Sequence, residues 1–459
     1  MSIARNACSF YLSRLRGELS RLIEATYPGY HPGPKIWLDV IVGLVETAQG
    51  YLALIDKRPA DEMKLLVDAE VLGEQAYAGL SLISGADASQ IPHQIVDPFQ
   101  RWVAALKITN TIFFRAEHVS NYELARIDCR TMAQNLNAPS ASLLSAIGAA
   151  KWPILRVTVP SQAMGMLPHF AVVAHELGHA IQDNINLNVA PFQAPFLDCI
   201  KRVTSRLKPL GFTYGLQENL LLRETLQNWV NEFKADAVGH ILVGPAFFFA
   251  LFGFLELAGR SYGLGKTHPP SDLRRKQLVR ELNDGAQSFQ SVMQGCAITP
   301  LVADYAPNVP NCPLKDTLFN EITKSCGEVQ AAICVELIEL FDVMAPAIFA
   351  AARKYLTIVS PELVYTPAHL SKDVQLHLKP LRSLIPPIEF QEAGSWKPTS
   401  LATILNVGWI ALLELRDEHA GASVAIPSSE TAPKMEQLHE LLLKAVELSE
   451  ARRLWEENR

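Results

Sequence analysis

Long apolar runs are scarce in this sequence of 459 residues. The most apolar stretch, Ile241–Leu255, is interrupted by glycine and proline, and it falls short of the about 20 residues that a membrane-spanning helix needs. The first residues of the chain form no apolar stretch long enough for a signal peptide. We therefore expect no transmembrane segment. We interpret 241–255 as a buried core helix, with a segment that dips into a membrane as the alternative.

Cysteine pairs and an excess of positive charge are also absent. The seven cysteines include no C-x-x-C pair, so we expect reduced thiols in a cytoplasmic protein. Lysine and arginine number 41 against 47 aspartates and glutamates, which leaves a net charge of −6. A general nucleic-acid-binding protein has the opposite excess. We therefore expect no nucleic-acid partner.

The composition that remains is typical of a folded protein with more than one domain. Hydrophobic residues make up 49% of the chain and charged residues 19%, which excludes a disordered chain. The length is sufficient for two or three domains. Helical spacing of apolar residues dominates the sequence, and strand patterns are few. The expected fold class is mainly α with a small β-sheet.

The most informative segment is 175–179, which reads His-Glu-Leu-Gly-His, an H-E-x-x-H pattern. Residues four positions apart lie on the same face of a helix, so His175 and His179 can bind one tetrahedral Zn²⁺. Glu176 lies at the edge of that face. From there it can deprotonate a metal-bound water without ligating the metal. The segment therefore predicts a zinc site with a general base beside it.

The residues before this segment agree with a zinc hydrolase. The run 170–174 is apolar, as expected for a helix inside a core. The stretch 152–159 has the pattern of a short strand, and Pro160 follows it. A strand followed by a metal-binding helix is the order found in zincin-type folds. In those folds an edge strand lines the substrate cleft, and we expect 152–159 to take that place.

Two histidines leave zinc one protein ligand short. The metzincin pattern would place glycine and then a ligand three and six positions after the second histidine. Gln182 and Ile185 occupy these positions, so the metzincin class is excluded. Asp183 lies four positions after His179, and we expect it to be a solvated residue in the last turn of the helix.

Glu232 is the stronger candidate for the third ligand. It follows Trp229 and Val230 on a predicted helix, and Asp236 lies one turn further along the same face. This spacing suits a ligating glutamate and a second carboxylate that accepts the free N–H of a ligand histidine. A solvated pair of acids is the alternative, and the apolar neighbours argue against full exposure.

A third segment, 268–274, reads H-P-x-x-x-x-R. Taken in order, H-E-L-G-H at 175–179, E-x-x-A-D at 232–236 and this third segment resemble the M48 type of gluzincin metallopeptidases. The resemblance covers about residues 150–285. Many M48 members carry transmembrane helices around the catalytic domain, and this chain departs from them in that respect.

The resemblance implies a role for each matching residue. His175, His179 and Glu232 would be the zinc ligands, Glu176 the base, and Asp236 the carboxylate behind a ligand histidine. His268 and Arg274 would lie beside the active site, where they support the substrate or the oxyanion. Tyr214 or Tyr262 is an alternative oxyanion stabiliser, and the sequence does not rank them.

These motifs suggest a division of the chain into three parts. We expect a helical N-terminal region at 1–110, a zincin-like metallopeptidase core at 111–298 and a helical C-terminal domain at 299–459. Residues 299–313 are rich in proline and asparagine and have the composition of a linker. In the C-terminal domain, the helical pattern at 318–356 is expected to kink or divide at Pro346.

The function expected from these motifs is zinc-dependent cleavage of peptide bonds in a protein or peptide substrate. Two other interpretations remain. The first is a regulatory protease of narrow specificity, gated by its helical flanks or by a partner that binds them, in stress or defence signalling. The second is a non-catalytic scaffold with a structural zinc site, although such a site has no need of Glu176.

Overall fold

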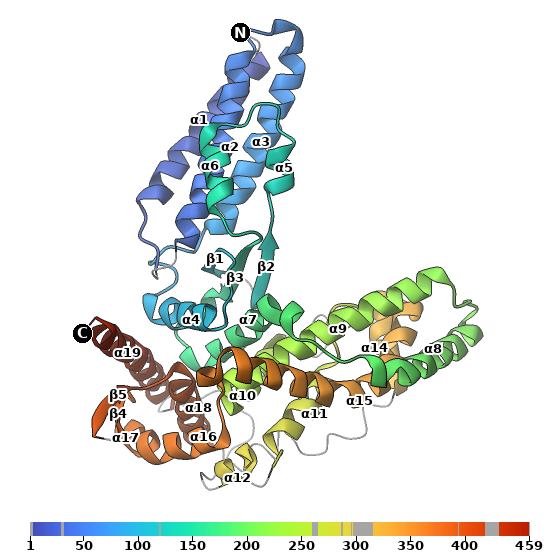
Figure 1. Cartoon of the computed structure of the whole chain (residues 1–459), viewed down its shortest axis with the longest axis vertical. Coiled ribbons are helices and arrows are strands. Elements are labelled where there is room, and N and C mark those ends of the chain that lie inside the picture. The colour runs from blue at the N-terminus through green and yellow to red at the C-terminus, as the bar shows by residue number, and fades with distance from the viewer. Residues whose placement is uncertain are drawn as a thin grey trace. The chain divides into compact units, whose positions relative to one another are not determined.

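The structure is a computed structural model, in which helices predominate (Figure 1). It describes residues 3–28, 32–118, 121–258, 265–285, 288–294, 296, 315–392, 394–417 and 431–458. Among these residues one sheet has three strands and a second has two. The expected fold class, mainly α with a small β-sheet, is therefore confirmed.

The chain divides into two compact units. One comprises Met1–Ala104 and Ile108–Met164, and the other comprises Ala105–Lys107 and Gly165–Arg459. The three-part division expected from the sequence places its boundaries elsewhere, after residues 110 and 298. The predicted linker 299–313 lies outside the described residues.

The first unit is built on a bundle of helices. Its core contains apolar residues of α2 at helical spacing, among them Trp37, Ile41, Leu44 and Ala48. Gly43 allows α6 to approach, because a Cβ at this position would lie 2.5 Å from the Cα of Leu143. The helices of this unit are α1 (Ile3–Glu24), α2 (Gly33–Leu54), α3 (Glu62–Ile83), α4 (His93–Ala105), α5 (Arg130–Gln134) and α6 (Ala141–Ala149).

Helix α2 bears on the expected absence of a transmembrane segment. Among the described residues it is the one helix that is long and apolar enough to cross a membrane, by length and composition only. In the most apolar part of the helix, 61% of the residues are buried inside the protein. Core helices of soluble proteins meet the same criterion, so the finding is weak evidence for a membrane span.

The first unit also contains the three-stranded sheet. Its strands are β1 (Ile112–Glu117), β2 (Glu123–Ile127) and β3 (Ile154–Pro160), in the order β1-β3-β2. β1 is parallel to β3 and β2 is antiparallel to it. The strand predicted at 152–159 therefore exists, but its expected place at the edge of the sheet is wrong. β3 lies in the centre of the sheet, between β1 and β2, and every residue of it is buried.

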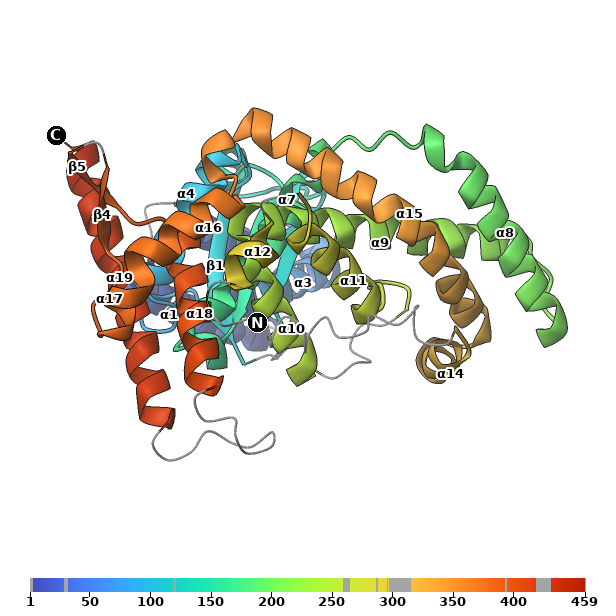
Figure 2. The ribbon, with the colours of Figure 1, turned by 90° about the horizontal axis from the view of Figure 1, so that it is seen from below.

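The second unit carries the H-E-x-x-H segment on the short helix α7 (Val173–Ile181). The long helices α9 (Leu216–Val243) and α15 (Glu328–Val359) pack along each other (Figure 2). Its remaining elements are α8 (Gln193–Leu207), α10 (Pro245–Ala258), α11 (Ser271–Leu282), α12 (Phe289–Gln294), α14 (Lys315–Cys326), α16 (Pro367–Asp373), α17 (Lys379–Arg382), β4 (Glu389–Glu392), β5 (Ser395–Pro398), α18 (Leu401–Asp417) and α19 (Thr431–Glu457).

The apolar stretch 241–255 is buried, as expected, but it is not one helix. Gly244 adopts φ 68°, a conformation that glycine tolerates and that ends α9 before α10 begins. Asn406 of α18 satisfies backbone groups at the break. Its Nδ2 donates to the Val243 carbonyl (2.6 Å) and its Oδ1 accepts from the Ala246 N–H (3.0 Å).

The sequence predicted a kink or a division of the helical stretch 318–356 at Pro346, and the predicted division is wrong. Pro346 lies inside the continuous helix α15, and the break occurs instead at Gly327, where φ is 84°. Met344, Ile348 and Phe349 are all buried around the proline. Tertiary packing therefore maintains the helix through a residue that removes one backbone donor, whereas a left-handed backbone cannot continue a helix.

Candidate metal centre

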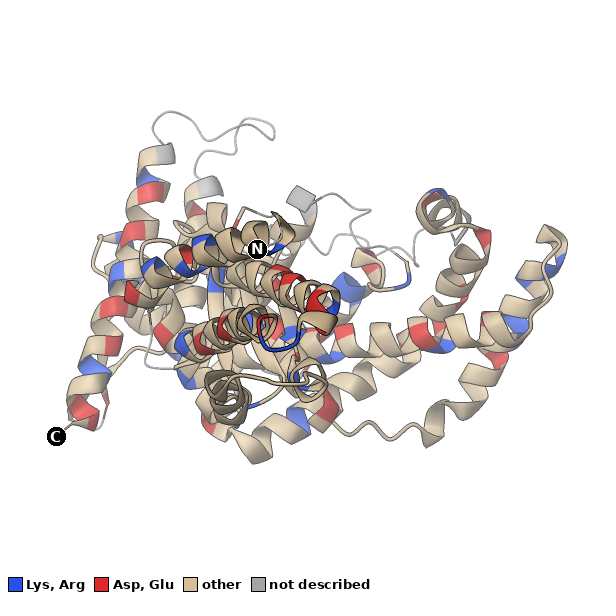
Figure 3. Cartoon of the chain, turned by 90° about the horizontal axis from the view of Figure 1, so that it is seen from above, with Lys and Arg blue, Asp and Glu red and all other residues tan. Residues whose placement is uncertain are grey.

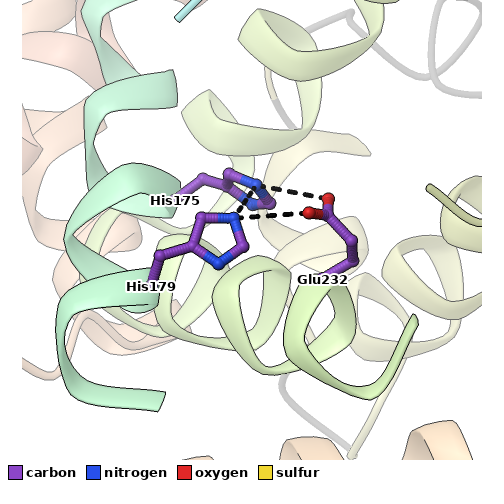
Figure 4. A group of neighbouring side chains, drawn as sticks. All are labelled: His175, His179 and Glu232. Carbon is purple, nitrogen blue, oxygen red and sulfur yellow. Dashed lines mark hydrogen bonds and ion pairs between the residues drawn. The ribbon is translucent and has the colours of Figure 1, made fainter. Parts of the chain in front are cut away.

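Three side chains from two helices converge in the second unit. His175 and His179 come from α7, and Glu232 comes from α9 (Figure 4). The two Nε2 atoms lie 3.2 Å apart. The Glu232 carboxylate oxygens lie 3.5 Å from His175 Nε2 and 3.4 Å from His179 Nε2. Ligands of a tetrahedral zinc with bonds of about 2.0–2.1 Å are about 3.3–3.4 Å apart. The donor atoms of the three residues therefore lie close enough together to hold one metal ion.

Asp236 lies behind the first histidine. Its Oδ1 is 3.0 Å from His175 Nδ1, and the side chain is fully enclosed. A carboxylate in this place accepts the Nδ1 proton, which leaves the lone pair of Nε2 directed toward the metal position. Asp236 thus has the place expected from its spacing of one turn after Glu232.

Arg274 of α11 has a different place from the one expected. Its Nε and Nη2 donate to the two Asp236 oxygens at 2.7 and 2.6 Å, and its Nη1 lies 3.7 Å from Glu232 Oε2. The side chain is buried. The guanidinium therefore interacts with two carboxylates. It positions Asp236 and does not face a substrate as an oxyanion donor.

His268 lies at the rim of the donor triangle. Its Nε2 is 3.6 Å from Glu232 Oε1, and about a third of the side chain is exposed. Two residues of α9 hold the segment before it. Trp229 Nε1 donates to the Gly265 carbonyl (2.9 Å) and Asn228 Nδ2 donates to the Lys266 carbonyl (3.2 Å). His268 thus lies beside the possible metal ligands with part of its imidazole exposed to solvent.

Of the two tyrosines that were alternatives to His268, Tyr214 lies away from the site. Tyr214 precedes α9, and its hydroxyl contacts Asn219 Oδ1 at 3.3 Å. Glu232 lies further along the same helix, about 20 Å from Asn219 at a rise of about 1.5 Å per residue. Tyr262 lies outside the described residues. Asp183 is exposed in the turn after α7, as expected.

Glu176 is buried on α7 between the two histidines in sequence, with 6% of its surface exposed. Its charge is among the influences that raise the pKa of His179, together with Glu232 and against the burial of the ring. This carboxylate therefore belongs to the electrostatic environment of the ligand group.

The charges of the group depend on one another. Burial by itself lowers the pKa of His175, but Asp236 and Glu232 outweigh it and raise the pKa to about 10. Burial by itself raises the pKa of Glu232, whereas His175 and His179 bring it well below its usual range. Protons on the imidazoles thus balance the buried carboxylates, and a divalent metal would replace these protons.

Two residues that support the site were not identified from the sequence. Gln182 Oε1 lies 3.0 Å from His179 Nδ1, so each ligand histidine has an acceptor behind it. The ring of Phe247 stacks on His175, with centroids 6.3 Å apart and planes at 13°. The spacing of three residues from His179 could have suggested Gln182. Nothing in the sequence could have suggested Phe247, because α10 reaches α7 only in the folded chain.

No family model, no curated protein and no solved structure matches this chain. The likeness to M48 peptidases therefore depends on the three short segments alone. The buried His-His-Glu group could hold a metal ion, and its geometry does not identify the metal.

Proposed function

We propose that this chain is a zinc-dependent endopeptidase of the M48-like gluzincin type, acting on a protein or peptide substrate. The observation that carries the proposal is the triangle of His175, His179 and Glu232, with a buried acid, Glu176, on the same helix. Two imidazoles and one carboxylate form the ligand set of catalytic zinc sites in peptidases. A structural site more often has four protein ligands and has no use for Glu176.

When bound, Zn²⁺ would lower the pKa of a water and polarise the scissile carbonyl. In our proposal Glu176 takes the proton of the attacking water and passes it to the leaving amine. His268 donates a hydrogen bond to the tetrahedral oxyanion, a contribution of typically about 10²–10³ in rate. Asp236 and Gln182 hold the two ligand histidines in orientation, and Arg274 holds Asp236.

The variant Glu176→Gln tests this assignment, because the amide keeps the size of the side chain and removes the base. We expect the purified variant to bind one zinc per chain as the native protein does. In cells, protein N-termini created in the presence of the native chain should be missing when the variant replaces it. The rate on any identified substrate should fall by about 10²-fold or more.

A matched control is Asp183→Asn, which neutralises an exposed acid close to the same helix. This control should leave the set of new N-termini unchanged. A Glu176→Gln variant that cleaves as well as the native protein would refute the proposal. Zinc binding with identical N-termini in all three strains would instead favour a scaffold with a metal site.

A further inference from the structure

The short segment that ends at His268 folds back on itself. Its first described residue, Gly265, is buried and adopts φ 129°, a backbone conformation that glycine tolerates better than other residues. The Gly265 N–H donates to the His268 carbonyl at 3.3 Å, so residues 265–268 form a closed turn. A Cβ on Gly265 would lie 3.0 Å from Cys326 Sγ of α14. The place of His268 therefore depends on what holds this turn.

Two side chains of α9 donate hydrogen bonds to the turn. Trp229 Nε1 donates to the Gly265 carbonyl at 2.9 Å, in a bond that is buried, and Asn228 Nδ2 donates to the Lys266 carbonyl at 3.2 Å. The Trp229 ring is fully enclosed and lies against Phe341 of α15, with centroids 5.4 Å apart. A buried carbonyl needs a donor. Here the donor is an indole that its neighbours hold in one orientation.

An ion pair contributes less to this attachment. Figure 3 shows acids interspersed with lysines and arginines along the helices, and Lys266 pairs in this way with Glu224 of α9 at 2.7 Å. Both side chains are about half exposed, and exposed pairs stabilise little because water and salt screen them. The buried hydrogen bond from Trp229 is therefore the stronger restraint on the turn.

The chain after His268 is also attached to α9. Two prolines follow His268 and lead into α11, whose Arg274 donates two hydrogen bonds to Asp236. Trp229, Glu232 and Asp236 follow one another at intervals of three and four residues, so they share one face of α9. The helix face that presents a candidate metal ligand thus also holds the chain on both sides of His268.

We propose that Trp229 is a positioning residue, which fixes His268 at the rim of the candidate metal centre through the hydrogen bond to Gly265. The inference rests on the proposed function, in which His268 donates to the oxyanion. His268 Nε2 lies 3.6 Å from Glu232 Oε1, and a displacement of about 1 Å at such a site can lower a rate by about 10²-fold. Trp229 acts through the turn and not by contact with the substrate.

The variant Trp229→Phe tests this role, because it removes the N–H and keeps an aromatic ring beside Phe341. The first measurement is hydrogen exchange of the full-length chain, followed by mass spectrometry. We expect the amides of residues 265–268 to exchange about tenfold or more faster in the variant, because the turn opens more often without its buried donor. Peptides from α7 should exchange as in the native chain. This measurement needs no substrate.

The matched control is Trp37→Phe in the first unit. Trp37 Nε1 donates to the Gly79 carbonyl at 3.0 Å, also in a buried bond, and the side chain is buried. The control therefore loses the same kind of hydrogen bond in another part of the chain. It should leave the exchange of residues 265–268 unchanged. Denaturant unfolding of both variants shows that each is folded and compares their losses of stability.

A second measurement distinguishes positioning from a general loss of structure. Zinc affinity of Trp229→Phe should remain close to that of the native chain. On a substrate identified from the new N-termini, kcat should fall by about tenfold with little change in KM, less than the about 10²–10³ for complete loss of an oxyanion donor. Adding His268→Ala should then cost less than it does in the native chain, because both changes act on one contact.

Two outcomes would overturn the inference. Equal exchange of residues 265–268 in Trp229→Phe and the native chain would show that the indole does not hold the turn, whether or not the chain cleaves peptides. Faster exchange with an unchanged kcat would show that the place of His268 does not affect the reaction. Failure of the proposed function is a separate result, in which the native chain itself creates no new N-termini.

Discussion

Gly178 of α7 faces Ala235 of α9 at a distance that allows no side chain on the glycine. A Cβ at position 178 would lie 2.7 Å from the Ala235 Cα and 3.0 Å from its carbonyl oxygen. Both neighbours are backbone atoms, so neither can turn aside. This close approach brings the histidines of α7 within reach of Glu232, one turn of α9 before Asp236.

The first prediction follows from this contact. Gly178→Ala should push α7 away from α9, lower the free energy of unfolding by about 1–3 kcal/mol and weaken metal binding. Gly50→Ala on α2 is the control, because a Cβ there meets nothing within 4 Å and should leave stability unchanged or raised. Denaturant unfolding and zinc titration of both variants measure these effects. Unaltered zinc affinity in Gly178→Ala would contradict the role given to the contact.

The second prediction concerns Arg274 and Asp236. Arg274→Lys keeps the positive charge but loses the two parallel hydrogen bonds to the carboxylate. We expect zinc affinity to fall by about 10- to 100-fold, the usual effect of losing a group that orients a ligand histidine. Asp236→Asn should lower zinc affinity by a similar factor. The double variant should bind zinc only slightly more weakly than either single variant, because Arg274 acts on the histidine through Asp236.

Competition for zinc with a chelating dye measures these affinities. Arg275→Lys is a neighbouring control, since Arg275 contacts the ring of Phe252. Additive losses in the double variant would show that Arg274 acts on the metal group through Glu232 instead.

The third prediction concerns pH and the buried residue His240. It lies against Phe289 and Phe349, with 1% of its surface exposed. Burial lowers its pKa to about 3, with a smaller contribution from Arg353. The unfolded chain therefore binds the proton between about pH 6.5 and 3 and the folded chain does not. Stability should fall as the pH is lowered through this window.

The variant His240→Leu removes this proton uptake. The difference in unfolding free energy between the variant and the native chain should grow in favour of the variant as the pH falls from 7 to 4. Denaturant unfolding at a series of pH values measures this difference. A difference that does not change with pH would show that His240 does not titrate on unfolding.

Several features of the site could be predicted from residues close together in the chain. The pairs His175 with His179 and Glu232 with Asp236 each lie one turn apart, so helix geometry alone places each pair on one face. Burial of 241–255 also followed from local composition. The break inside that stretch did not, because it depends on the left-handed backbone at Gly244 and on the contacts of Asn406 from α18.

Other features required the folded chain. The strand at 152–159 has the same pattern in the centre of a sheet as at its edge, so its pairing with β1 and β2 could not be foreseen. Arg274 was expected beside the substrate, because its motif places the residue near the active site but does not identify the group that it contacts. Its two hydrogen bonds to Asp236 depend on how α11 packs against α9.

The sequence by itself determined which residues can serve as ligands and which of them share a helix face. Both follow from chemical type and from the 3.6-residue period of a helix. Only the tertiary structure decided that α7 and α9 meet at Gly178 and Ala235, and that a carboxylate from one helix completes the histidine pair of the other. This packing depends on the fit of two helix surfaces that are 50 residues and more apart in the chain. Residue spacing within either helix does not specify it.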